Sequence, residues 1–288
     1  MRLLEPLFIL LSSAIIMVAC SPPRNIIILA GQSNMAGRGG VTTDGTTGVK
    51  SWDGVVPPES QPNPSVLRLA GNLTWVIAAE PLHKDIDVRR INGVGPGMAF
   101  ANSILSDLSD VGLVPCAIGG SKILEWQKGE FYYEQMIARA EAALRNGGVL
   151  RAMLWFQGES DTTNENDAVS YGGRLENFFI SCRSELQSPD LPIFQVALAS
   201  GEGRYVETVR EAQLAVSFPN VYCVDAMGLE LESDRLHLDT ASQVKLGKML
   251  AGSFIQFLKA SDLSGTNKET TRVWHIMLVI AGVFSFLP

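Results

Sequence analysis

The sequence predicts an α/β fold in which a five-stranded parallel sheet lies between two layers of helices. Five short apolar runs, rich in β-branched residues, alternate with longer segments of helical periodicity. Strands buried on both faces are continuous apolar runs, and such alternation is typical of a parallel sheet with right-handed crossovers. The 288 residues, 46% of them hydrophobic, can bury the core of one such domain. No internal repeat and no linker divides it.

The first part of the chain predicts one buried strand, a long loop, a hairpin and a helix. The strand is a β-branched run that Gly31 ends, the loop is rich in Gly, Thr and Pro, and the hairpin turns at Gly71-Asn72. The helix follows the breaker Gly95-Pro96-Gly97. We expect these elements over residues 25–30, 38–66, 66–79 and 98–108, respectively.

The remainder alternates between strand and helix. Each strand is a short apolar run, and the helices place their apolar residues on one face. The expected strands are 111–118, 150–156, 192–199 and 221–226. The expected helices are 130–145, 166–187, 205–216 and 240–258.

Both ends of the chain carry apolar segments that resemble targeting signals. Residues 1–20 combine a basic start, a short apolar run and small residues, which is typical of a secretory signal peptide; the alternative is an N-terminal membrane anchor. Residues 259–288 are a polar spacer and an apolar tail, which resemble a GPI-attachment signal; the alternative is a short anchor or a loosely packed tail. We expect a secreted or extracellular domain over 24–258, with a C-terminal lipid anchor as its route of membrane attachment.

The composition argues against nucleic acid as a partner. The 23 basic and 30 acidic residues give a net charge of −7, so no basic surplus exists to meet phosphates. Cys116, Cys182 and Cys223 show no metal-binding spacing and are expected to be buried thiols, with one disulfide as the alternative in an oxidising compartment. Asn72-Leu73-Thr74 is a glycosylation sequon, which agrees with secretion.

Four polar segments follow predicted strands or lie in the loop before the last helix. In α/β sheets ligands bind at the carboxyl ends of the strands, so we expect these segments to meet at one edge. The segments are Gly31–Asn34, Gly119–Ser121, Gln157–Ser160 and Asp234–His237.

Ser33 and His237 are the candidates for nucleophilic catalysis. Glycines flank the Ser33 turn, and a serine hydroxyl needs a base to take its proton. Asp234, three residues before His237, can bind Nδ1–H and leave Nε2 for the serine; Asp239 is its nearby rival. Taken singly, the serine could cap a turn and the histidine could bond locally, but their joint position favours catalysis. His83 lacks such neighbours and is expected to be a loop histidine.

Acyl transfer also needs donors for the developing oxyanion. The backbone N–H of Ser33 is one candidate. Gly119 or Gly120 can supply a second, because a glycine lets its backbone approach a ligand closely. The side-chain amide of Gln157 is the third candidate, and the alternative is an amide that ties loops together.

The four polar segments resemble the blocks of the SGNH hydrolase superfamily. More narrowly, the chain is similar to the sialate O-acetylesterase-like carbohydrate esterases of family 6, the plant acetylxylan esterase type among them. The resemblance covers about residues 24–258 and implies a flavodoxin-like three-layer α/β/α sandwich. It also implies hydrolysis of O-acetyl esters on sugars, such as acetylxylan or pectin, without metal or cofactor. The matching blocks are Gly31–Met35, Ile118–Ser121, Gln157–Asp161 and Asp234–His237.

By position, the resemblance implies that Ser33 is the nucleophile, His237 the base and Asp234 its partner. The oxyanion hole would then comprise Ser33, Gly119, Gly120 and Gln157, where many SGNH hydrolases have Asn in place of this glutamine. We expect Gln32, Asn34 and Glu159 to contact substrate. Glu159 has two alternatives: it could orient His237 in place of Asp234, or it could pair with Arg38.

Two other functions compete with carbohydrate deacetylation. The first is an esterase of the same mechanism that acts on lipid or aryl esters, although Trp52 and Trp126 in nearby loops suit sugar stacking better. The second is a non-catalytic carbohydrate-binding protein, which would predict damage to the triad. A flavodoxin-like binding module is disfavoured because the sequence has no phosphate-binding glycine loop. The acetylated polymer and the oligomeric state stay open.

Overall fold

The computed structural model describes residues 25–145 and 147–283, with side chains described up to residue 261. The expected signal peptide, residues 1–20, lies outside the described part, as does the end of the expected tail, residues 284–288.

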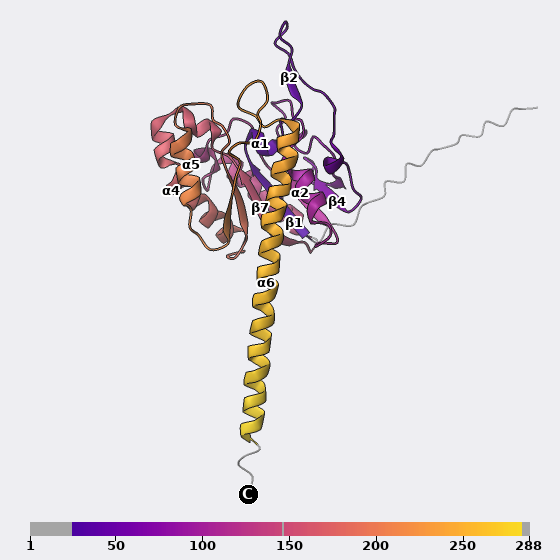
Figure 1. Cartoon of the computed structure of the whole chain (residues 1–288), viewed down its shortest axis with the longest axis vertical. Helices are drawn as coiled ribbons and strands as arrows, with labels where there is room; N and C mark the ends of the chain where they lie inside the picture. Colours follow the sequence, from indigo (N-terminus) through magenta and orange to yellow (C-terminus); the bar gives the residue numbers. More distant parts are fainter. Residues whose placement is uncertain (1–24, 146, 284–288) are drawn as a thin grey trace, which may run out of the picture.

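A seven-stranded sheet forms the centre of the molecule, in the order β5-β4-β6-β1-β7-β8-β9 (Figure 1). All neighbouring strands are parallel except β5, which runs antiparallel to β4. The strands are β1 Asn25–Gly31, β4 Val66–Leu69, β5 Trp75–Ile77, β6 Val111–Pro115, β7 Val149–Phe156, β8 Ile193–Ala197 and β9 Val221–Asp225. The α/β prediction is confirmed, with helices on both faces.

The predicted count of five strands is wrong, because the sheet has seven. The expected hairpin over 66–79 does form, as β4 and β5. It also joins the sheet, since β4 pairs in parallel with β6 and Val66 lies opposite Val111. A second hairpin, β2 Val41–Thr43 with β3 Lys50–Trp52, interrupts the segment predicted to be a loop.

The helices divide between the two faces of the sheet (Figure 1). On one face α2 and α6 pack together, and the rings of Phe100 and Phe254 meet at 5.7 Å. On the other face, Trp155 of β7 and Tyr133 of α3 both contact Phe178 of α4, while Gln195 of β8 donates to a carbonyl of α5. The helices are α1 Ser33–Ala36, α2 Pro96–Ile104, α3 Phe131–Leu144, α4 Glu165–Glu185, α5 Val206–Ala215 and α6 Thr240–Val283, with short 3-10 turns η1 Pro58–Ser60, η2 Ile123–Trp126 and η3 Glu159–Thr163.

Helix α6 is longer than the predicted 240–258 and extends beyond the body of the sheet (Figure 1). The segment 259–283 contains no proline, and its two glycines, Gly265 and Gly282, each weaken a helix by only about 1 kcal/mol. The expected polar spacer therefore continues the helix. Within the described residues, no helix is both long and apolar enough to cross a membrane.

The end of β1 sets the position of the polar edge. All seven residues of β1 are buried, because β6 and β7 flank the strand. Gly31 has φ +129°, and a Cβ there would lie 2.1 Å from the carbonyl oxygen of Phe156. Only glycine fits this turn, which ends the strand and starts α1 at Ser33.

The cysteines described in the structure are free thiols. Cys116 and Cys182 are buried, as expected, whereas Cys223 is exposed on β9. Burial raises the pKa of the Cys116 thiol to about 11, so this group stays protonated and unreactive near neutral pH.

Candidate active site

The predicted catalytic residues meet at the carboxyl edge of the sheet in a pocket of about 230 Å³. Ser33 comes from the turn after β1, Gly119 and Gly120 follow β6, and Asp234 and His237 lie in the loop before α6. Segments more than 200 residues apart in the sequence therefore line one cavity.

Ser33, His237 and Asp234 form a continuous hydrogen-bond chain. The Oγ of Ser33 lies 3.0 Å from Nε2 of His237, and Nδ1 of His237 lies 2.6 Å from Oδ2 of Asp234. With Nδ1–H donating to the carboxylate, Nε2 is free to accept the serine proton. Asp239, the rival of Asp234, instead accepts from the backbone N–H of Ser242 in the first turn of α6.

The Asp234 carboxylate also closes the turn that carries the histidine. Its Oδ1 accepts hydrogen bonds of 3.0 Å from the backbone N–H groups of Leu236 and His237. Arg235 in between has φ +56°, so the turn is tight. The three-residue spacing thus lets one carboxylate bind both the imidazole, as the sequence predicts, and the turn, which was not predicted.

The electrostatics keep the imidazole neutral and the carboxylate charged. Burial lowers the pKa of His237, and the Asp234 carboxylate opposes this effect. Burial alone would raise the pKa of Asp234, but hydrogen bonds from the backbone and ring of His237 and from Leu236 lower it. A neutral histidine beside an ionised aspartate is the state that a general base requires.

Ser33, Gly119 and Gly120 line one wall of the pocket. Ser33 is the first residue of α1, where a backbone N–H has no helical acceptor. A Cβ at Gly119 would lie 2.5 Å from Nη2 of Arg38, and Gly120 has φ +79°. Side chains are thus excluded from this wall for steric and conformational reasons, and the backbone itself faces the cavity.

Gln157 lies beneath the pocket and does not line it. Its side chain is fully buried, and Nε2 lies 2.6 Å from Oδ2 of Asp161, 2.9 Å from the carbonyl of Ser121 and 3.2 Å from Oε1 of Gln32. The two amide protons are therefore directed at protein acceptors. This geometry supports the alternative, a structural amide that ties loops together, and gives no support to an oxyanion donor at Gln157.

The predicted substrate-binding residues Gln32, Asn34 and Glu159 also lie under the pocket, each fully buried. Oε1 of Glu159 accepts from Asn34 at 2.7 Å, and Oδ1 of Asn34 accepts from the backbone N–H of Leu238 at 2.9 Å. Gln32 contacts the loop after β7. These groups are buried away from the pocket lining, and they connect the His237 loop to the Ser33 turn.

Glu159 contacts neither His237 nor Arg38. Burial raises its pKa to about 7, and the hydrogen bond from Asn34 opposes that rise. Arg38 is buried and pairs with Asp87, while its Nη1 donates to Asn92 at 2.8 Å. The observed partner of the Glu159 carboxylate is therefore Asn34, and not His237 or Arg38 as the two alternatives from the sequence would have it.

For several other residues, the structure differs from the prediction made from the sequence. Trp126 is fully buried and packs on Trp155, so it cannot stack on a sugar. Lys50 and Arg90 line the pocket and were not predicted to do so. The adjacent arginines Arg89 and Arg90 are a basic pattern in the sequence that could have pointed to Arg90. His83 lies in a turn, as expected, but is fully buried, and burial lowers its pKa to about 3.

The sequence of this domain matches a known family. The sequence model of the carbohydrate esterase, sialic acid-specific acetylesterase family matches residues 23–256. The chain belongs to this family and is accordingly a carboxylic ester hydrolase of the carbohydrate esterase type.

Individual relatives agree with this assignment. A protein of Arabidopsis thaliana named "Probable carbohydrate esterase At4g34215" is 51% identical over 238 residues, which cover 81% of this chain and 91% of the relative. A solved structure of the Arabidopsis protein AT4G34215 is 52% identical, with a TM-score of 0.80 over 82% of this chain and 99% of that one.

More distant structures share the fold. NanS, at 16% identity, has a TM-score of 0.65 and covers 84% of this chain and 99% of its own. XAC1771, a carbohydrate acetylesterase from Xanthomonas citri, has a TM-score of 0.53 at 17% identity, over 79% of this chain and 55% of its own.

Proposed function

We propose that the chain is a serine esterase that hydrolyses O-acetyl esters on carbohydrate through an acetyl-serine intermediate. The observation that carries this proposal is the chain from Ser33 Oγ to His237 Nε2, 3.0 Å, and from His237 Nδ1 to Asp234 Oδ2, 2.6 Å, in a small pocket. Membership of a carbohydrate esterase family supports the substrate class.

In the first half-reaction, His237 Nε2 takes the Ser33 proton while Oγ attacks the acetyl carbonyl carbon. The carbonyl π electrons move to oxygen, and the backbone N–H groups of Ser33 and of Gly119 or Gly120 stabilise the oxyanion. The intermediate collapses, the bond from the acyl carbon to the sugar oxygen breaks, and His237 donates its proton to the leaving hydroxyl.

In the second half-reaction, a water molecule attacks the acetyl-serine. His237 takes a proton from the water, and collapse of the second intermediate breaks the bond to Ser33 Oγ. Acetic acid leaves, the proton on His237 returns to the serine, and the enzyme is restored. Asp234 stays ionised throughout, because its role is to hold the imidazole and stabilise its charged form.

The decisive experiment measures acetate release from an aryl acetate and from acetylated xylan, pectin and sialic acid. We expect release from at least one carbohydrate, and a fall of kcat by about 10³-fold or more in Ser33→Ala. An organophosphonate should label Ser33 in the native chain. Full activity of Ser33→Ala, with the label on another residue, would overturn the serine mechanism.

We also propose that the enzyme acts outside the cell. The signal-like pattern of residues 1–20 and the exposed sequon at Asn72 support this proposal. The apolar end of 259–288 supports attachment through a lipid anchor. Mass spectrometry of the mature protein should find both apolar ends removed and a glycan on Asn72; two intact ends would contradict the proposal.

A further inference from the structure

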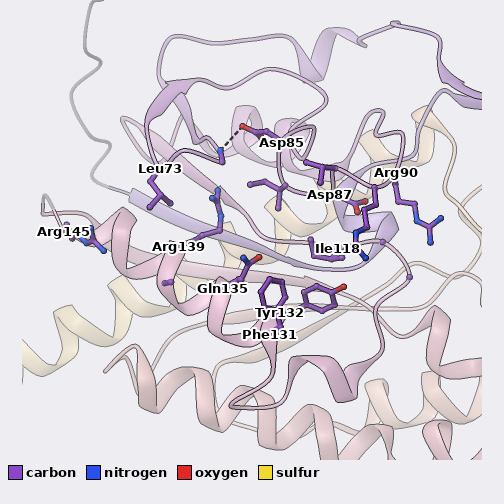
Figure 2. Close-up of a pocket in the computed structure, with 17 residues that line it drawn as sticks. Leu73, Asp85, Asp87, Arg90, Ile118, Phe131, Tyr132, Gln135, Arg139 and Arg145 are labelled. Carbon is purple, nitrogen blue, oxygen red and sulfur yellow. Dashed lines mark hydrogen bonds between the residues drawn. The ribbon is translucent and has the colours of Figure 1, made fainter.

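A second and larger cavity, of about 980 Å³, adjoins the Ser33 pocket (Figure 2). It lies between the loop 85–90, the segment 118–120 after β6 and one face of α3. Arg90, Gly119 and Gly120 line both cavities, so the larger one begins at the wall that we assign to the oxyanion. Its volume is far above what an acetyl group occupies and falls in the range of ligand-binding clefts.

The free charges in this cleft are positive. Arg89 and Arg90 are both exposed, and within the part of the chain that the structure describes neither side chain forms an ion pair. The two carboxylates that line the cleft are already neutralised, Asp85 by Arg68 and Asp87 by Arg38. An unpaired arginine pair beside a catalytic pocket stands out in a chain of net charge −7.

The Ser33 pocket itself carries charges of both signs. Glu202, Glu232 and Asp234 line it together with Lys50, whereas Arg90 belongs to the wall shared with the larger cleft. An anionic group on the substrate is repelled by the carboxylates and attracted by the arginines. Because the carboxylates among the described lining residues of the larger cleft are both paired, an acidic chain is favoured there over the Ser33 pocket.

An aromatic surface completes the cleft. Phe131 is 67% exposed at the start of α3, and its ring meets that of Tyr132 at 5.8 Å. Figure 2 shows the two rings on one side of the cavity and Asp87 and Arg90 on the other. Exposed apolar rings of this kind mark ligand-binding grooves, and they suit the C–H face of a sugar. Gln135, one helical turn on, adds an exposed amide that can bind hydroxyl groups.

We propose that this cleft binds the sugar residue next to the acetylated one in an acidic polysaccharide, with Arg90 and Arg89 taking the carboxylate of a uronic acid. The planar guanidinium matches a carboxylate through two parallel hydrogen bonds. The inference rests on the proposed esterase function and specifies its substrate class.

The test compares two acetylated oligosaccharides that differ in one group. One carries a uronic acid beside the acetylated sugar, and the other carries the primary amide of that acid, which has the same shape and no charge. We expect wild-type kcat/KM for acetate release to be at least about fivefold higher on the acid, because a guanidinium forms stronger hydrogen bonds with a carboxylate than with a neutral amide. The preference should shrink as salt is raised.

The variants Arg90→Gln and Arg89→Gln should each lose much of this preference, and Arg90→Lys should keep part of it. Arg151→Gln is the matched control, because this exposed arginine lies on β7, away from the cleft lining, and should keep the wild-type ratio. Equal wild-type rates on both substrates, or an unchanged ratio in Arg90→Gln and Arg89→Gln, would overturn the inference while leaving the esterase function intact. Absence of acetate release from every substrate, the aryl acetate included, would instead overturn the esterase function.

Discussion

The proposed mechanism requires that His237 present a neutral Nε2 to Ser33, and the Asp234 carboxylate favours this state. Asp234 binds Nδ1 at 2.6 Å, whereas Glu159 reaches the histidine loop only through Asn34. The two acidic groups therefore differ in kind, since one contacts the base and the other holds the loop that carries it.

This difference predicts unequal effects of two isosteric substitutions. Asp234→Asn should lower kcat by about 10²–10⁴-fold, because the amide can hold the wrong tautomer and cannot stabilise the imidazolium. Glu159→Gln keeps an oxygen acceptor for Asn34 and should lower kcat by less than about tenfold. Steady-state kinetics on an aryl acetate measures both, and a larger loss in Glu159→Gln would reverse the assignment.

The pH profile provides an independent readout of the same pair. Burial already lowers the pKa of His237, and the negative charge of Asp234 opposes that shift. In wild type, kcat/KM should therefore fall on the acid side with a midpoint below the ordinary histidine value of 6.5. Removal of the charge in Asp234→Asn should move that midpoint to lower pH, whereas Glu159→Gln should leave it nearly in place.

At the scale of elements, the loop 85–92 is fixed to the nucleophile turn by a buried ion pair. Arg38 lies just after α1 and binds both Asp87 and Asn92. The same guanidinium packs against Gly119, since a Cβ there would lie 2.5 Å from Nη2 of Arg38, so it also supports the wall of the pocket. Three segments that follow different strands thus depend on one arginine.

We expect Asp87→Asn to lower the free energy of unfolding by about 3–5 kcal/mol, because it leaves the buried Arg38 charge without its partner. The matched control is Glu59→Gln, which breaks the exposed pair with Lys248 and should leave the free energy of unfolding nearly unchanged, because solvent screens an exposed pair. Urea denaturation followed by circular dichroism gives both values. Similar losses in the two variants would show that burial of the Arg38 pair has no special effect.

The elements that the sequence predicted well are those whose environment is uniform. The run 25–30 is apolar at all but its first position because both faces of β1 are covered. A continuous apolar run of this length predicts a buried strand even when the neighbouring strands are unknown. The addition of β4 to the sheet depends instead on the pairing of Val66 with Val111, which local patterns do not encode. The two extra strands were therefore missed although their hairpin was expected.

The same distinction applies to the site. Ser33, Asp234 and His237 could be found because short motifs place them in turns and the sheet brings turns together. The orientation of the Gln157 side chain could not be predicted from a motif. Its amide donates to Asp161, Ser121 and Gln32, and these acceptors come together only in the folded structure. The sequence likewise does not show which aromatic side chains are exposed: Phe131 is exposed, whereas Trp126 is fully buried.

At the scale of the whole molecule, buried acidic groups couple folding to pH. Glu80 is buried, its oxygens accept from the backbone N–H groups of Leu82 and Gly95, and burial raises its pKa to about 8. Burial also raises the pKa of Glu159 to about 7 and of Asp161 to about 6. For each group the folded state holds a proton that the unfolded state releases, so its contribution to stability is full below the unfolded pKa and lost as pH rises through the folded one.

The buried His83 acts in the opposite direction but in a different range. Its pKa of about 3 lies below the ordinary value of 6.5, so it destabilises the fold only as pH falls below 6.5. Between pH 6.5 and 8 the titrating groups among these are therefore Glu159, with a pKa of about 7, and Glu80, with a pKa of about 8. The free energy of unfolding should fall across this window, with a slope of up to about 1.4 kcal/mol per pH unit from each of the two groups. Glu80→Gln should flatten the slope between pH 7.2 and 8.0, where Glu159 is already mostly ionised, whereas Asp161→Asn should leave this slope in place because Asp161 has already titrated. Denaturation curves at pH 6.5, 7.2 and 8.0 measure it, and an equal slope in wild type and Glu80→Gln would assign the pH dependence to another group.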